Sequence, residues 1–143
     1  MTLLPDAQAF LHSVLAARPQ LAVFDCDGTL WDLDAGEGFF YWEMEQGLLP
    51  PQVAAWARAR YQEYRAGRVG EEQMCGEMVT IHEGLDDATL AAAAARYFRA
   101  HVVGKIFPEM AELVCRLHAR GCEVWAVSST NDWVINAAAQ QFE

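Results

Sequence analysis

A short apolar run that ends at a pair of carboxylates is the strongest constraint on the fold of this chain. The run, Leu21–Phe24, reads LAVF; it is too short for a helix and rich in strand formers, so it predicts a buried β-strand. Asp25 and Asp27 follow directly, before Gly28 and Thr29. In open α/β sheets, ligands bind just beyond the carboxyl ends of the strands. Two acids there repel each other unless a cation neutralises them or they share a proton, so we predict a metal or acid–base site.

A second apolar run, within residues 123–128, predicts another buried strand. The helix before it is clearly marked. Pro108 stands in its first turn, apolar residues recur at helical spacing, and Gly121 marks its end. A strand, a helix and a strand with buried runs indicate a parallel βαβ pair. We therefore predict an α/β fold with a partial, Rossmann-like parallel sheet.

The chain between the two strands is far longer than the roughly dozen residues that a crossover needs. Residues 32–104 show successive amphipathic helix patterns with glycines between them, and no strand pattern. We predict an α/β core from residues 1–31 and 105–143, interrupted by an all-helical insert over residues 32–104. The insert leaves the core beside the acid pair, where it is placed to cover it.

Charge and hydropathy argue against nucleic acids and membranes as partners. The net charge of −10 argues against nucleic-acid binding, because no basic stripe is present to displace counterions. No apolar run approaches the roughly 20 residues that span a bilayer. Residues 1–15 pattern as an amphipathic helix without a basic start, unlike a signal peptide. We expect a cytoplasmic protein.

The four cysteines, Cys26, Cys75, Cys115 and Cys122, form no CxxC pair, so reduced thiols are expected. Cys115, His118 and Cys122 have a spacing that a zinc site can use, but no fourth ligand is evident. We favour structural burial over zinc for these residues.

The motif from Asp25 to Leu30, DCDGTL, resembles the first signature of the haloacid dehalogenase-like hydrolase superfamily. The strand ending in Ser128 resembles the second signature, and the helical insert resembles the small cap of that family. The pattern over residues 124–134 is most similar to the phosphoserine-phosphatase-like branch. The resemblance implies that Asp25 is the nucleophile and Asp27 the general acid/base. It also implies that both hold Mg²⁺, Asp27 through its main-chain carbonyl, and that Ser128 holds a phosphoryl oxygen.

The chemistry of these residue types agrees with the implied roles. A carboxylate that attacks phosphorus splits one difficult hydrolysis into two easier steps. Mg²⁺ prefers one or two carboxylates together with phosphate oxygens and water. Thr29 can hydrogen-bond the nucleophile or the local backbone, and Ser128 with the amides of Ser129 and Thr130 is expected to bind phosphate at the start of the next helix. We expect a Mg²⁺-dependent phosphatase that acts on a small phosphorylated metabolite. Dehalogenation is disfavoured because Asp27 supplies the acid that a phosphate-ester leaving group needs.

Each motif also has a purely structural interpretation. An Asp-x-Asp-Gly-Thr string occurs in turns and calcium loops, although here it follows a strand. Asp32, Asp34 and Glu37 fit a solvated helix start, while the functional alternative is that one of them contacts a substrate amine. The neighbouring aromatic residues are expected to form core rather than a cation-binding cage.

The resemblance covers residues 20–143 but only half of the family's signature elements. The family also has a phosphate-binding lysine after the Ser128 strand and a further strand whose acids complete the Mg²⁺ site. Lys105, the only lysine, precedes Ser128 and is expected at the surface. We therefore expect the N-terminal part of a longer enzyme. The alternative is a catalytically incomplete remnant that acts as a binding module, with a homodimer through an exposed sheet edge.

Overall fold

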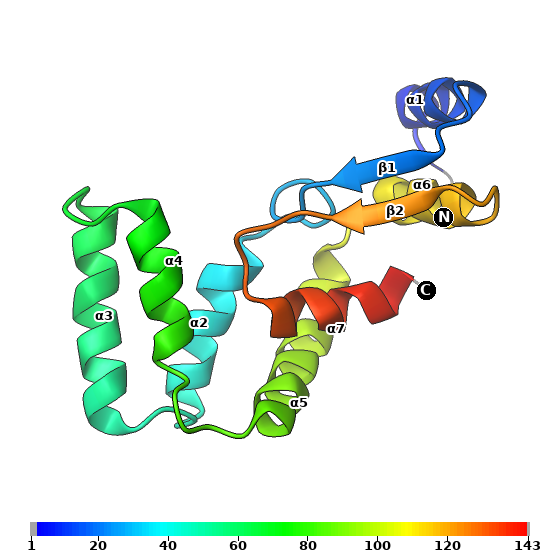
Figure 1. Cartoon of the computed structure of the whole chain (residues 1–143). Helices are drawn as coiled ribbons and strands as arrows, with labels where there is room; N and C mark the ends of the chain where they lie inside the picture. The colour runs from blue at the N-terminus through cyan, green and yellow to red at the C-terminus, as the bar shows by residue number, and fades with distance from the viewer. Residues whose placement is uncertain (1–2, 143) are drawn as a thin grey trace.

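The computed structural model describes residues 3–142, so the first two residues of the predicted N-terminal helix lie outside the described part. The fold is mixed α/β, as predicted: a two-stranded parallel sheet with many helices (Figure 1). The elements in chain order are α1 Pro5–Ala16, β1 Leu21–Phe24, α2 Ala35–Glu45, α3 Pro51–Arg65, α4 Glu71–Thr80, α5 Asp87–Tyr97, the π-helical turn η1 Phe98–Val102, the 3₁₀ turn η2 Val103–Lys105, α6 Pro108–His118, β2 Glu123–Ala126 and α7 Asp132–Phe142.

The two strands run side by side with their carboxyl ends at the same edge (Figure 1). Their register pairs Leu21 with Glu123 and Phe24 with Ala126, and the amide of Val127 donates to the carbonyl of Phe24 at 2.8 Å. β2 therefore ends at Ala126, two residues earlier than predicted. The segments that follow the strands begin at Asp25 and at Val127, so both leave the sheet from the same edge, at the carboxyl ends of the paired strands.

The two faces of the sheet differ in burial. α1 and α6 cover one face, where Ala22, Phe24 and Val124 pack against leucines of both helices. On the other face Val23 and Trp125 are 54% and 53% exposed. The prediction of fully buried strands was wrong for these alternate positions, because side chains of a strand point to opposite faces and helices cover only one of them in the described chain.

The segment between the strands is helical, and α3 and α4 form a hairpin that projects away from the sheet (Figure 1). The main hydrophobic cluster joins α2 and α5 to α7, with Trp31, Phe39, Tyr97 and Val134 at its centre. The predicted core of aromatic residues is thus confirmed for Trp31 and Phe39, which are fully buried. Among residues 3–142, no helix has the length and apolar character that crossing a membrane requires.

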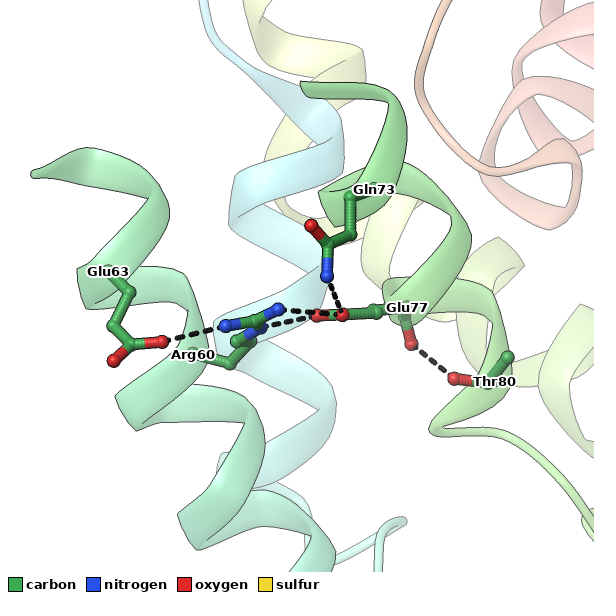
Figure 2. A network of polar contacts seen from close by, with 5 residues as sticks. All are labelled: Arg60, Glu63, Gln73, Glu77 and Thr80. Atoms are coloured by element: carbon green, nitrogen blue, oxygen red, sulfur yellow. Dashed lines mark hydrogen bonds and ion pairs between the residues drawn. The ribbon is translucent and has the colours of Figure 1, made fainter. Parts of the chain in front are cut away.

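Arg60 joins α3 to α4 (Figure 2). Its guanidinium donates from Nε to Oε2 of Glu77 at 2.6 Å and from Nη2 to Oε1 at 2.9 Å, and from Nη1 to Glu63 at 2.8 Å. Gln73 donates to Oε1 of the same glutamate at 2.8 Å. A bidentate guanidinium–carboxylate pair is the strongest geometry for such a contact. The network therefore adds a charged contact to the hydrophobic packing between the two helices.

We expect this network to make stability depend on acid pH. Arg60 lowers the pKa of Glu77 below its ordinary value of 4.5. Because the folded-state pKa is depressed, the stabilisation is complete above about pH 5 and is lost as the pH falls through the lowered pKa. Thermal unfolding of the wild type and of Glu77→Gln should differ near neutral pH and converge in acid. Glu72→Gln, on the same helix, is the matched control, and a difference that persists unchanged in acid contradicts the assignment.

Candidate active site

The chain turns sharply after β1. The amides of Thr29 and Leu30 both donate to the carbonyl of Cys26, at 3.1 and 2.8 Å. Gly28 has φ +73°, a left-handed conformation that glycine adopts without strain. The turn places Asp25 and Asp27 at the carboxyl end of β1, with Asp25 exposed and Asp27 partly buried.

Asp25 is held by one neighbour. The hydroxyl of Thr29 donates to its Oδ2 at 3.0 Å, which is one of the two roles predicted for this threonine. The hydrogen bond orients the carboxylate, and among the described residues Oδ1 accepts no hydrogen bond. A contact of Thr29 with substrate stays a prediction.

Asp27 accepts three hydrogen bonds. Its Oδ1 receives the indole N–H of Trp31 at 2.6 Å and the amide of Ala35 at 2.8 Å, and its Oδ2 receives the hydroxyl of Thr130 at 2.7 Å. Ala35 is the first residue of α2, so the carboxylate also lies at the positive end of that helix. Asp27 thus connects the β1 loop, α2 and the segment after β2.

Sequence reasoning missed Trp31 and Thr130 as partners of Asp27. A signal existed for Trp31, because a buried indole N–H requires an acceptor and Asp27 stands four residues away. The contact with Thr130 spans most of the chain, and only the pairing of β1 with β2 reveals it.

The segment after β2 differs in detail from the prediction. The amide of Thr130 donates to Oγ of Ser128 at 3.1 Å, and α7 begins only at Asp132, where Asn131 caps it by accepting from the amide of Val134 at 3.0 Å. The expectation that the amides of Ser129 and Thr130 lie in the first turn of the helix was therefore wrong. Ser128 forms a turn with Thr130 through its side chain, and the helix begins two residues later. Through the Thr130–Asp27 bond, this segment and the β1 loop meet at one end of the sheet.

A cavity of about 160 Å³ lies where this end of the sheet meets α2, α3 and α4. From the sheet side it is lined by Asp27, Ser129, Thr130 and Asn131. Asp25 is exposed and does not line the cavity. A small molecule in the cavity would therefore contact Asp27.

The oxygen atoms around Asp25 and Asp27 are chemically suited to Mg²⁺, which prefers hard oxygen ligands. Both carboxylate oxygens of Asp27 already accept hydrogen bonds, so its main-chain carbonyl is the available ligand, together with the carboxylate of Asp25. Over residues 3–142, no group of three or more His, Cys, Asp or Glu side chains is arranged to hold a metal ion.

In the described chain no cysteine belongs to a group of three or more side chains that could hold a metal ion. Cys122 is buried as predicted, but Cys115 and His118 are exposed, so the expected burial was wrong for those two. Cys26 lies fully buried in the turn, where burial, and then the charges of Asp27 and Asp25, raise the pKa of its thiol to about 11. It stays protonated at neutral pH and cannot compete with Asp25 as a nucleophile.

Gly38 allows α2 to approach α5. A Cβ at this position would collide with the phenol ring of Tyr97, which is only 3% exposed. We expect Gly38→Ala to lower the free energy of unfolding by about 1–3 kcal/mol, because overpacking outweighs the gain in helix propensity. Gly76→Ala is the matched control: it lies in α4 with open space around it and should be neutral or stabilising.

Chemical denaturation of both alanine variants measures this difference. Adding Tyr97→Phe to Gly38→Ala should restore part of the loss, since the hydroxyl is the nearest atom. Equal effects of the two glycine replacements would show that the close approach is not what places α2.

The comparisons with known proteins agree with this geometry. The model of the haloacid dehalogenase-like hydrolases matches residues 22–143. A crystal structure of a protein of unknown function from Bordetella pertussis Tohama I is similar, with 25% identity and a TM-score of 0.68 over 87% of this chain and 56% of that one. The chain thus spans just over half the length of that protein. A search of the curated proteins found no match. Matched over nearly all of its length, the chain belongs to the haloacid dehalogenase-like hydrolases.

Proposed function

We propose that this chain hydrolyses phosphomonoesters of a small metabolite with the help of Mg²⁺, through a phosphorylated Asp25. The observation that carries the proposal is the Asp27–Thr130 hydrogen bond of 2.7 Å, which holds the loop of the two acids against the segment that follows the neighbouring strand. In this proposal a phosphate on Asp25 contacts Thr29, Ser128 and Ser129.

In the proposed reaction, Oδ1 of Asp25 attacks phosphorus while Thr29 holds Oδ2. Asp27 gives a proton to the leaving oxygen and later takes one from the attacking water. The hydroxyl of Thr130 can donate or accept, so rotation about its C–O bond lets it serve both protonation states of Asp27. Mg²⁺, when bound by Asp25 and the carbonyl of Asp27, supplies positive charge between two anions.

The same proposal includes three wider points. The core consists of residues 1–31 and 105–143, and residues 32–104 are the cap that supplies the cavity wall. Thr29, Ser128 and Ser129 bind the phosphate. The protein acts in the cytoplasm, where its four free cysteines remain reduced.

The proposal is tested by thermal unfolding with Mg²⁺ and trifluoroberyllate, a mimic of a phosphoryl group on a carboxylate. A ligand at a hundred times its dissociation constant stabilises the folded state by about 2.7 kcal/mol. We expect a clear rise in melting temperature that requires both components and disappears in Asp25→Asn. An unchanged melting temperature of the wild-type protein would contradict the proposed site.

The exposed sheet supports a second candidate function, self-association. Val23, Trp125 and Val127 are each more than half exposed, and a short sheet with open edges pairs readily with another. The occupant would be a second copy of this chain. Sedimentation at micromolar concentration should then show a dimer that Val23→Lys dissociates, and a monomer at all concentrations would reject it.

A further inference from the structure

Trp133 joins the helix after β2 to the helical insert. It is the second residue of α7, and its indole N–H donates to Oδ1 of Asp87 at 2.7 Å. Its ring packs edge-on against the ring of His82, with the two centroids 4.9 Å apart. Asp87 is the first residue of α5, and His82 lies in the turn between α4 and α5. The insert therefore contacts this one side chain of α7 from two places.

The histidine ring that Trp133 contacts is itself held by two helices. Nε2 of His82 lies 2.7 Å from Oε2 of Glu43 on α2, and Nδ1 lies 3.3 Å from the carbonyl of Val79 on α4. Glu43 is 1% exposed and His82 is 7% exposed. A buried polar group that loses its partner costs free energy, so this pair keeps one arrangement. Trp133 therefore packs against a side chain with a defined position.

The backbone just before Trp133 leads to the proposed acid. Asn131 caps α7 by accepting from the amide of Val134 at 3.0 Å. Thr130, one residue earlier, donates its hydroxyl to Oδ2 of Asp27 at 2.7 Å. The cap and the first turn of a helix hold neighbouring residues in a fixed geometry. The position of the first turn of α7 therefore determines where the hydroxyl of Thr130 lies.

Apolar packing alone defines the position of α7 along α5 only loosely. The two helices are neighbours, and both contribute small side chains to the main hydrophobic cluster, Ala93 and Ala94 from α5 and Ala137 and Ala138 from α7. Hydrophobic contacts are non-directional, and packed helices can slide past each other by small shear movements. A hydrogen bond fixes both a distance and an angle. The Trp133–Asp87 bond therefore supplies a directional contact between the first turns of the two helices.

We propose that Trp133 is a positioning residue for Asp27. Its bond to Asp87 and its contact with His82 set the first turn of α7, and through that turn the Thr130–Asp27 hydrogen bond. The kinetic consequence of this inference rests on the proposed phosphatase function. The structural consequence, a dependence of the hydrogen bonds of Asp27 on Trp133, requires no turnover.

A nuclear magnetic resonance signal reports on Asp27 in the resting protein. The indole N–H of Trp31 donates to Oδ1 of Asp27 at 2.6 Å, so its signal in a nitrogen–proton correlation spectrum follows the state of that carboxylate. Hydrogen bonds to one group polarise each other, so loss of the Thr130 bond at Oδ2 changes the bond at Oδ1. The chain has five tryptophans, and single replacements by Phe assign their indole signals.

Asp87→Ala is the test variant, because it removes the acceptor of the Trp133 indole and leaves every aromatic ring in place. We expect it to shift the Trp31 signal. Asp87→Asn is the matched control. It removes the same charge but keeps an acceptor oxygen, so the Trp31 signal should stay at its wild-type position. A Trp31 signal that Asp87→Ala leaves unmoved overturns the proposal. Equal shifts in both variants show an effect of charge alone and overturn it as well.

Kinetics show whether this link affects the reaction. Asp87→Ala should lower kcat for an alkyl phosphate by about three- to tenfold, the value of one net hydrogen bond, and kcat for an aryl phosphate by less than about twofold. The alkyl ester suffers more because its leaving oxygen needs the proton of Asp27. In a Thr130→Val background the same replacement should add nothing, since the link acts through the Thr130 hydroxyl. Equal losses for both esters, or an additive loss in that background, contradict the positioning role.

The two measurements separate this inference from the proposed function. A Trp31 signal that moves in Asp87→Ala but not in Asp87→Asn, in a protein that hydrolyses no phosphate ester, supports the link from Trp133 to Asp27 and contradicts the phosphatase. Hydrolysis that requires Asp25, in a protein whose Trp31 signal ignores Asp87→Ala, supports the phosphatase and contradicts the link.

Discussion

Replacing Asp25 by Asn is expected to reduce hydrolysis of an aryl phosphate by at least about a thousandfold. An amide is a poor nucleophile, and it removes one negative charge from the proposed Mg²⁺ site. The fold should remain, because the amide oxygen can still accept the hydroxyl of Thr29 and the side chain is exposed. Steady-state kinetics with Mg²⁺, together with a thermal melt, measure both effects.

Asp6→Asn is the matched control for this variant. It makes the same carboxylate-to-amide change at an exposed position on α1, away from the site. Mass spectrometry of the Asp25→Asn protein excludes deamidation back to aspartate as a source of residual turnover. Activity within tenfold of the wild type, in protein shown to carry Asn, would remove Asp25 from the role of nucleophile.

Asp27→Asn has the second largest expected effect, a loss of about 10²–10⁴ in kcat. The change keeps the local structure, because the amide oxygen accepts from Trp31 and Ala35 while the new N–H₂ group donates to the hydroxyl of Thr130. An alkyl phosphate, whose leaving oxygen needs a proton, should suffer more than an aryl phosphate. The phosphorylated form of Asp25 should accumulate, since water has lost its base.

Asp27→Ala separates chemistry from structure. It strands the N–H groups of Trp31 and Ala35, and an unsatisfied buried donor costs about 1–3 kcal/mol. We expect Asp27→Ala to be clearly less stable than Asp27→Asn although both are slow. If the two variants unfold alike, the three hydrogen bonds do not hold the site. If Asp27→Asn affects alkyl and aryl esters equally, Asp27 is not the acid.

Local signals in the sequence were sufficient to predict the secondary structure around the candidate site. The LAVF run predicted β1, and the acids after it predicted the loop at its carboxyl end. The helical spacing after Pro108 predicted α6, which begins at that residue. Each of these features depends on neighbours in the chain, which is why residue types and spacing reveal them.

Features that depend on packing between distant segments were not predictable in the same way. Val23 and Trp125 are exposed because α1 and α6 cover the other face of the sheet. The contact of Thr130 with Asp27 follows from strand pairing, and the Glu43–His82 pair joins α2 to the end of α4. The late start of α7 reflects a serine that bonds the next turn before the helix begins. No periodicity encodes any of these.

The most direct test of the account is to identify where phosphate is bound during turnover. The protein is mixed with substrate and Mg²⁺, quenched in acid within milliseconds, digested and analysed by mass spectrometry. The account predicts one phosphoryl group on Asp25, more of it in Asp27→Asn, and none in Asp25→Asn. A phosphoryl group on another residue, or steady hydrolysis with no labelled protein at any time, would contradict it.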